Sequence, residues 1–199
     1  LRAPEYAHTL QMFEPHPTRG WKLKPKIRAY LCTPDYSVLH ATNSRGYRDV
    51  EHELLKPAGV YRVVVLGDSF MEAGQVALEE SFARVLEAEL AAASGRRVEV
   101  INLGCSGYGQ VQELLALRED GLAYAPDLVL LAFLLDNDLR NNHPGLEQEM
   151  GWFPNRPFAR VGAEGELELF TPGGAKGYMD MQAMAEAKRR EDEAQPFWE

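Results

Sequence analysis

The chain has 199 residues, a formal net charge of −9 and 45% hydrophobic residues. This length is sufficient for one α/β domain with its own core, and the composition is that of a folded protein rather than a disordered tail. The negative charge argues against nucleic acid as the main partner, because phosphate binding needs a basic surface. No apolar run approaches the roughly 20 residues of a membrane-spanning helix. Two cysteines are too few for a disulfide scaffold.

Charge and composition change near residue 58. Residues 1–58 contain nine Lys/Arg and six Asp/Glu, a net charge of +3, whereas residues 59–199 contain twelve and twenty-four, a net charge of −12. The first part is rich in Pro and aromatic residues and lacks helical periodicity, and residues 26–31 and 36–42 form two short extended stretches in it. We therefore expect a Pro-rich N-terminal extension over residues 1–58, followed by an α/β domain over residues 59–199.

Apolar runs and helical periodicity alternate in the second part. Continuous apolar runs over residues 61–66, 98–103 and 128–135 predict buried strands, and a period near 3.6 predicts helices over residues 77–93 and 110–124. This β-α-β-α-β order with short connections is typical of a parallel sheet with right-handed crossovers. The sequence therefore predicts the α/β fold class.

The C-terminal part of the chain follows a different pattern. Residues 158–161 and 166–170 flank a Gly-Ala-Glu-Gly segment, which predicts a β-hairpin. Residues 179–193 predict a charged helix that acts as a solvated cover.

Each predicted strand is followed by a polar cluster: Gly67-Asp68-Ser69, Gly104-Cys105-Ser106-Gly107 and Asp136-Asn137-Asp138. The carboxyl ends of parallel strands meet at one edge of a sheet, which is where open α/β sheets bind ligands. A serine that starts a helix exposes its hydroxyl beside backbone amides that stabilise a negative oxygen. A glycine permits close approach to its N–H group, and an asparagine offers a side-chain donor. Together these clusters predict a nucleophile and an oxyanion hole for acyl transfer.

Three segments resemble, in order, the first three conserved blocks of the SGNH, or GDSL-like, hydrolases: Val63–Phe70 (VVVLGDSF), Val100–Gly109 (VINLGCSGYG) and Phe133–Asp138 (FLLDND). Upstream, Asn43–Asp49 (NSRGYRD) resembles a lead-in found in one bacterial branch of that family. The resemblance covers roughly half of the chain, from Asn43 to Asn142. The third block departs from the family in one position, since Leu135 stands where a glycine is common.

The resemblance implies a flavodoxin-like, three-layer α/β/α sandwich that needs no metal or organic cofactor. It assigns Ser69 as the nucleophile. It assigns the amides of Ser69 and Gly104 and the side chain of Asn137 to the oxyanion hole. We interpret Asp68 as a structural hydrogen-bonding residue, and Asp138 as the residue that holds the loop carrying Asn137.

The general base is the missing part of this site. The family takes it from a C-terminal Asp-x-x-His, but the only histidine after Asn137 is His143, which has no aspartate three residues earlier. Asp49 and His52 match the pattern but precede the first predicted strand. Without a base, serine is a weak nucleophile at neutral pH. His52 and His143 are therefore candidate bases, and we also expect the chain to lack the last strands and the Asp-x-x-His of the family.

The sequence favours a serine esterase that hydrolyses an acetyl or short acyl ester, on a small molecule or a carbohydrate, through an acyl-enzyme intermediate. Two alternatives stay open: a catalytically incomplete binding module of the same fold, and an envelope carbohydrate O-acyltransferase. We expect no cofactor, no metal and no nucleic-acid partner. The relatives favour an extracytoplasmic location, although no signal peptide is visible, and a homo-oligomer stays open.

Overall fold

The computed structural model describes residues 12–33, 35–150 and 155–172, with side chains in the last helix only as far as Glu147. The helix predicted over residues 179–193 lies outside this part. Among the described helices, none has the length and apolar character needed to cross a membrane.

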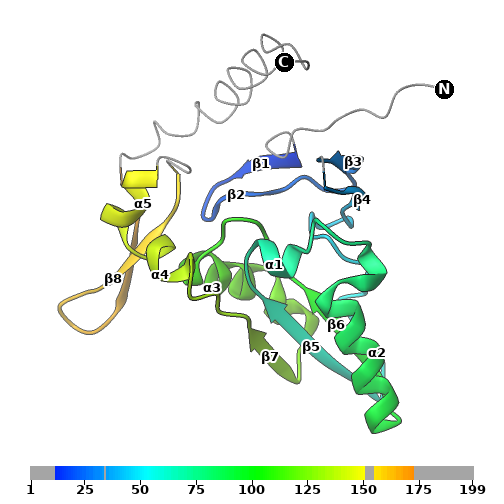
Figure 1. Cartoon of the computed structure of the whole chain (residues 1–199). Helices are drawn as coiled ribbons and strands as arrows, with labels where there is room; N and C mark the ends of the chain where they lie inside the picture. The colour runs from blue at the N-terminus through cyan, green and yellow to red at the C-terminus, as the bar shows by residue number, and fades with distance from the viewer. Residues whose placement is uncertain (1–11, 34, 151–154, 173–199) are drawn as a thin grey trace, which may run out of the picture.

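The strands and helices are labelled in Figure 1. The strands are β1 (Phe13–His16), β2 (Gly20–Leu23), β3 (Arg28–Cys32), β4 (Ser37–Ala41), β5 (Val60–Leu66), β6 (Arg97–Asn102), β7 (Leu128–Leu131), β8 (Phe158–Val161) and β9 (Leu167–Phe170). The helices are α1 (Ser69–Glu72), α2 (Phe82–Ser94), α3 (Gln110–Glu119), α4 (Asp138–Asn141) and α5 (Pro144–Met150), with the 3₁₀ turns η2 (Leu78–Glu80) and η3 (Gly121–Tyr124).

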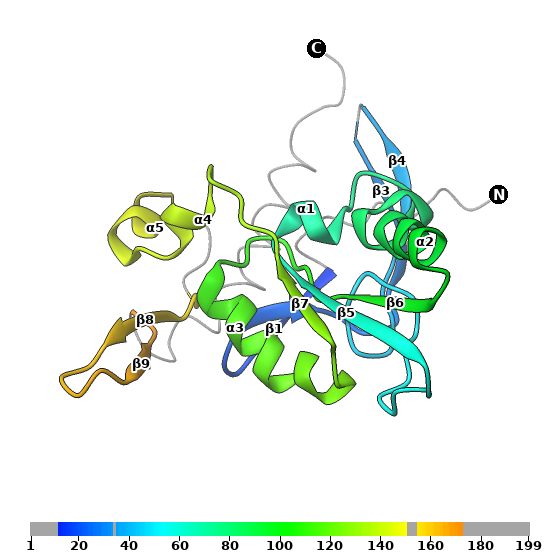
Figure 2. The ribbon, with the colours of Figure 1, turned by 90° about the horizontal axis from the view of Figure 1, so that it is seen from below.

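The centre of the molecule is a parallel sheet of three strands in the order β6-β5-β7. Val63 and Val65 of β5 pack in one core cluster with Ala83 of α2, and the alternate residues Val64 and Leu66 pack in another cluster with η3. Figure 2 shows α2 and α3 on opposite sides of the sheet. The predicted α/β class with a parallel sheet is therefore confirmed, and valines dominate β5 because branched side chains fit a strand that is buried on both faces.

The third strand is shorter than predicted, because β7 ends at Leu131 and not at residue 135. Its central neighbour β5 ends at Leu66, whose carbonyl accepts from Ala132 N at 3.0 Å. Beyond that point no described strand pairs with residues 132–135. Instead, the Asp138 carboxylate accepts from Leu134 N at 2.7 Å, which turns the chain out of the sheet.

The two predicted helices are also subdivided. Residues 77–93 form the turn η2 and then α2, and residues 110–124 form α3 and then η3. The second break falls at Asp120, whose carboxylate accepts from Tyr47 Oη at 2.6 Å and from the Arg45 guanidinium at 2.7 Å. These bonds fix Asp120 in a non-helical conformation, with φ −120° and ψ −48°.

The N-terminal extension contains two antiparallel hairpins, β1-β2 and β3-β4. The predicted stretches correspond to β3 and β4, whereas β1 and β2 were not predicted. Trp21 of β2 lies edge-on to Tyr108, with ring centroids 5.9 Å apart, and its Nε1 donates to Ser106 O at 3.0 Å. The hairpins therefore share a core cluster with the loop that follows β6. The boundary at residue 58 stays a prediction.

The remaining hairpin, β8-β9, matches its prediction, with register Phe158↔Phe170 to Val161↔Leu167.

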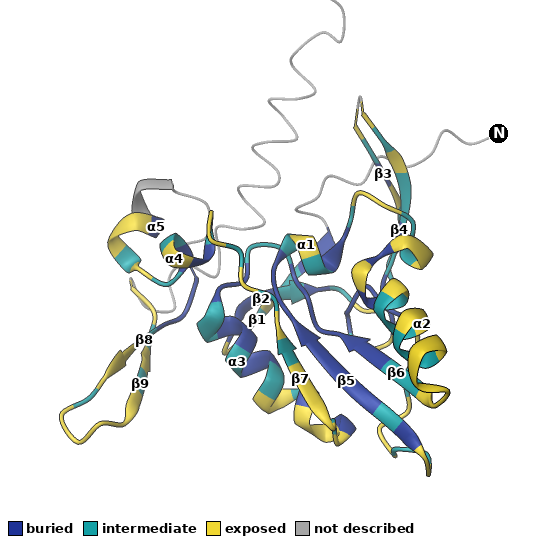
Figure 3. Cartoon of the chain, turned by 60° about the horizontal axis from the view of Figure 1, so that its bottom comes forward, coloured by how far each residue is buried: buried dark blue, intermediate teal, exposed yellow. Residues whose placement is uncertain are grey.

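Burial is uneven across the parallel sheet, as Figure 3 shows. Residues of β5 are almost all buried, while Leu128, Val129 and Leu131 of β7 are exposed. The apolar edge strand is thus open to solvent in the described part of the chain.

Replacing Trp21 with alanine is expected to destabilise the protein by about 3–5 kcal/mol, because it removes a fully buried aromatic side chain from the shared core. The exposed Tyr30 in β3 provides the matched control, and Tyr30→Ala is expected to stay within about 0.5 kcal/mol of wild type. Urea unfolding measures both values. Equal, small losses for the two variants would show that the extension does not share the core.

Candidate functional site

The site begins at a helix of one turn. Ser69 is the first residue of α1, directly after β5, and its side chain is half-buried. Asp68 caps this turn, since its Oδ1 accepts from Phe70 N at 2.9 Å. Within the described residues, Ser69 Oγ has no hydrogen-bond partner. The serine hydroxyl therefore stands at the carboxyl edge of the sheet without a contact that would activate it.

The second oxygen of the Asp68 carboxylate reaches the third polar cluster. Asp68 Oδ2 accepts from Asn137 Nδ2 at 2.7 Å. One buried carboxylate thus binds the backbone of the serine turn through one oxygen and the asparagine side chain through the other. The first and third predicted clusters are brought together by this residue.

Gly104, from the second cluster, is pressed against α1. A Cβ atom at this position would lie 2.5 Å from Met71 Cβ and 2.7 Å from Glu72 N, so only glycine fits. Its amide donates to Asn102 Oδ1 at 2.9 Å. The predicted oxyanion donor therefore already has an acceptor in the protein. Its role in an oxyanion hole stays a prediction, as do those of the Ser69 amide and Asn137.

The C-terminal end of α1 is held by Arg48, a fully buried residue of the NSRGYRD segment. Its guanidinium donates to the carbonyls of Glu72 at 3.1 Å, Ala73 at 2.7 Å and Val76 at 2.5 Å. A short helix leaves its last carbonyls without intrahelical partners, and this side chain supplies them. Sequence reasoning did not single out Arg48, although the segment that contains it was noted.

Glu72 ties the same helix to two further elements. Its Oε1 lies 3.0 Å from His40 Nε2 in β4, and its Oε2 accepts from Ser106 N at 2.6 Å. Because a carboxylate only accepts, His40 donates through Nε2. These two contacts fix α1 against the β3-β4 hairpin and the loop after β6.

Asn102 and Asp49 complete this support. Asn102 Nδ2 donates to Met71 O at 2.7 Å, while the Asn102 amide donates to Asp49 Oδ2 at 2.8 Å. Asp49 also pairs with Arg84 at 3.1 Å. An asparagine directly after the apolar pair Val100-Ile101 was the one sequence signal that could have identified this position.

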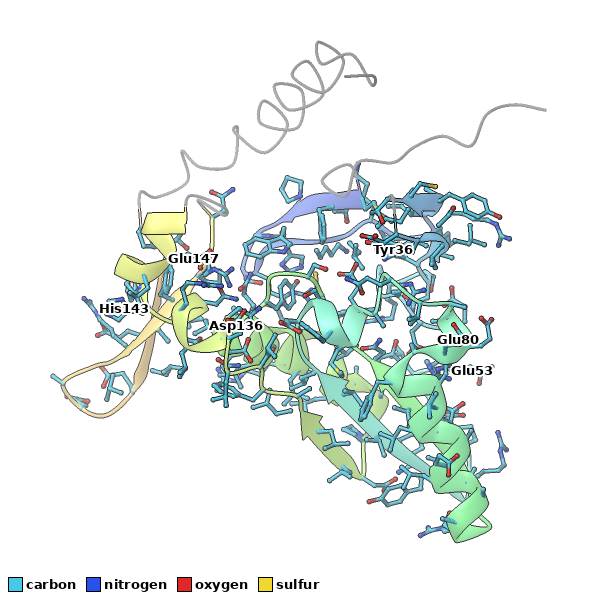
Figure 4. The ribbon with its side chains drawn as sticks, in the orientation of Figure 1. Tyr36, Glu53, Glu80, Asp136, His143 and Glu147 are labelled. Carbon is cyan, nitrogen blue, oxygen red and sulfur yellow. The ribbon has the colours of Figure 1, made fainter. Side chains whose placement is uncertain are left out.

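Neither candidate base contacts Ser69 among the described residues. His52 Nε2 lies 3.1 Å from Asp49 Oδ2, and the His52 ring packs edge-on to Tyr124. His143 is exposed, and its Nδ1 accepts from Leu146 N at 3.3 Å. It directly precedes α5, the helix that carries Glu147 (Figure 4). The structure therefore assembles the serine, aspartate and asparagine, but not a histidine, at this edge.

A further buried acidic side chain interacts electrostatically with Asp68 and Asp138. Glu113 of α3 is almost fully buried, and its Oε1 has no partner within the described chain. Burial, with the charges of Asp138 and Asp68, raises the pKa of Glu113 to about 8. Burial also raises the pKa of Asp138. Glu113 is therefore mainly protonated at neutral pH, and no motif in the sequence indicated it.

Comparison with protein-family models and with curated proteins finds no match for the chain. Within the described residues, no group of three or more His, Cys, Asp or Glu side chains is arranged to hold a metal ion.

Gly104→Ala is expected to displace α1, because the added methyl group meets both the side chain of Met71 and the backbone of Glu72. We expect a loss of about 1–3 kcal/mol in unfolding free energy. Gly74→Ala is the control, since a Cβ there meets its nearest neighbour, His40 Cδ2, at an ordinary 3.7 Å. Thermal unfolding of both variants tests the packing, and equal midpoints would contradict it.

The Glu113 pKa predicts how stability depends on pH. Between the ordinary value of 4.5 and the native value of about 8, the folded protein binds about one proton more than the unfolded chain at this residue. Its contribution to stability is therefore complete at the acidic end of this window and is lost as the pH rises. Glu113→Gln is expected to remove this fall, whereas Glu53→Gln, at an exposed position, retains it. Urea unfolding across the window measures the slopes, and an unchanged slope in Glu113→Gln would refute the assignment.

Proposed function

We propose that the chain is a serine esterase of the SGNH type, which hydrolyses an acetyl or short acyl ester through an acyl-enzyme intermediate. The three-layer sandwich of that family is part of the proposal. The observation that carries it is the hydrogen bond between Asn137 Nδ2 and Asp68 Oδ2, 2.7 Å long. This bond joins the loop of the third block to the serine turn, so that a nucleophile and an amide donor lie at one edge of the sheet.

In this mechanism Ser69 Oγ attacks the ester carbonyl and forms the new C–O bond, while its proton passes to a general base. The carbonyl oxygen becomes an oxyanion, which the Ser69 amide and the second N–H of Asn137 stabilise. The alcohol leaves with a proton, and water then releases the acid from Ser69. Asp68 accepts one N–H of Asn137, which orients the other N–H.

Proton transfer from Ser69 needs a general base, and none of the described residues contacts Ser69 Oγ in that role. His52 and His143 remain the candidates from the sequence. Use of either would require its imidazole to leave the contacts described above. If one of them is the base, its alanine variant is expected to be as inactive as Ser69→Ala.

The absence of a described partner for Ser69 Oγ favours one alternative, a binding module of this fold without catalytic activity. Ser69 has no described partner that could take its proton, and an unactivated serine is a poor nucleophile. Such a module would keep the Asp68–Asn137 contact and bind its ligand at the same edge. Activity measurements separate the two functions.

The decisive test is hydrolysis of a chromogenic acetyl ester by the wild type, Ser69→Ala and Asn137→Ala. An esterase loses its activity in Ser69→Ala, and Asn137→Ala lowers kcat by about 10²–10³ because an oxyanion donor is removed. Asp136→Asn, a change at the exposed neighbouring residue, is the control and retains the wild-type rate. Equal hydrolysis by the wild type and Ser69→Ala would exclude the esterase and leave the binding module.

A further inference from the structure

The β8-β9 hairpin has one apolar face that is open to solvent. The hairpin stands away from the parallel sheet in two views (Figure 1 and Figure 3). Its register pairs Ala159 with Leu169 and Val161 with Leu167, and alternate residues of a strand share a face. These four side chains therefore lie together, and we call them the apolar hairpin face. Val161 is 73% exposed, Leu167 46% and Leu169 45%.

The opposite face of the hairpin has its own contacts. Arg160 pairs with Glu168 across the strands at 2.6 Å, and its guanidinium lies over the Phe170 ring, 5.8 Å from the centroid. A two-stranded hairpin alone is at best marginally stable in water, and packing against a helix is one way to stabilise it. Among the described elements, β8 and β9 make their main contacts with each other. The apolar hairpin face is therefore the side that such a helix would cover.

The small size of the apolar hairpin face argues against a second copy of the chain as its partner. Three partly exposed aliphatic side chains offer on the order of 300 Å² of apolar surface. A stable dimer needs about 800 Å² on each partner. A segment of the same chain needs less area, because a short tether holds it at an effective concentration in the millimolar range. Residues 173–199 follow the hairpin directly, and the glycines at their start allow the chain to reverse its direction.

The sequence of that segment contains an apolar stripe of suitable polarity. The helix predicted over residues 179–193 places Met181, Met184 and Ala185 on one side, at the i, i+3 and i+4 spacing of a buried helical face. Lys188 continues this stripe seven residues after Met181, which is about 10 Å farther along the helix axis. The stripe therefore offers an apolar part followed by a positive charge.

The apolar hairpin face has the same order of features over the same length. From Leu169 to Glu166, three residues of β9 and its turn cover about 10 Å. Glu164 and Glu166 lie at the exposed tip of the hairpin, and no Lys or Arg in the described part of the chain pairs with either. A helix with Met181 against Leu169 would bring Lys188 to this acidic tip. Polarity, charge and length thus agree on one direction, from the base of the hairpin to its tip.

From this agreement we propose that residues 179–193 dock as a helix on the apolar hairpin face, with Met181 against Leu169 and Lys188 beside Glu166. The docked helix and the hairpin form a two-layer unit that buries apolar surface on both partners. The proposal does not depend on the esterase, since none of these residues belongs to the serine turn.

Thiol exchange with glutathione tests this placement in the full chain, with Cys32→Ser to remove a partly accessible native thiol. The test pair is Leu169→Cys with Met181→Cys. The control pair is Glu168→Cys with Met181→Cys, because Glu168 and Leu169 are neighbours on opposite faces of the hairpin. The effective concentration of the two thiols is expected to be at least about tenfold higher in the test pair. Equal values would overturn the docking, and so would disulfide-linked dimers as the main product, which would assign the face to a second copy.

Hydrogen exchange of the β8-β9 amides gives a second readout in the full chain. Replacing both Met181 and Met184 with aspartate is expected to speed this exchange at least about tenfold, because the undocked hairpin opens more often. Replacing both Ala183 and Ala187 with aspartate adds the same charge on the other side of the predicted helix, and exchange stays that of the wild type. Equal exchange rates in the two double variants would refute the proposal.

Discussion

A helix of one turn cannot maintain its own conformation, because nucleation of the first turn is unfavourable and both ends leave backbone groups unpaired. The helix that begins with Ser69 is held from outside. Asp68 caps its first turn, and Arg48 donates to the carbonyls at and beyond its last turn. A buried guanidinium needs such acceptors as much as the carbonyls need a donor. The position of the serine therefore depends on a residue of the N-terminal segment, far from it in sequence.

This dependence explains why the extension folds against the sheet. His40 from β4 contacts Glu72, and Trp21 from β2 contacts Ser106, so both hairpins touch the loops that surround α1. The sheet itself contributes the bond from Asn102 Nδ2 to Met71 O, and the loop after β6 contributes the contact at Gly104, where the backbones are too close for a side chain. The extension thus stabilises the serine turn through contacts that replace the hydrogen bonds of additional helical turns.

The sequence predicted those features that depend on local patterns. The valine-rich β5 was identified because both of its faces are buried, and the clusters at the strand ends followed from the geometry of parallel sheets. The β1-β2 hairpin was not predicted; its first strand contains Pro15, and proline is tolerated in a strand at a sheet edge. The end of β7 was missed because it is fixed by the length of β5 and by Asp138. Arg48 and Glu72 have no local pattern, since their partners are distant in sequence.

The protonation of Glu113 has a consequence for any reaction at this edge. Asp68, Asp138 and Glu113 together would place three negative charges near the position where an oxyanion would form. Because burial and the other two carboxyl groups raise the pKa of Glu113 to about 8, one of those charges is absent at neutral pH. Repulsion that would oppose a developing negative charge is thereby reduced without the loss of Asp68, which is needed to orient Asn137. Glu113 is thus mainly uncharged at neutral pH, while Asp68 accepts from both Phe70 N and Asn137 Nδ2.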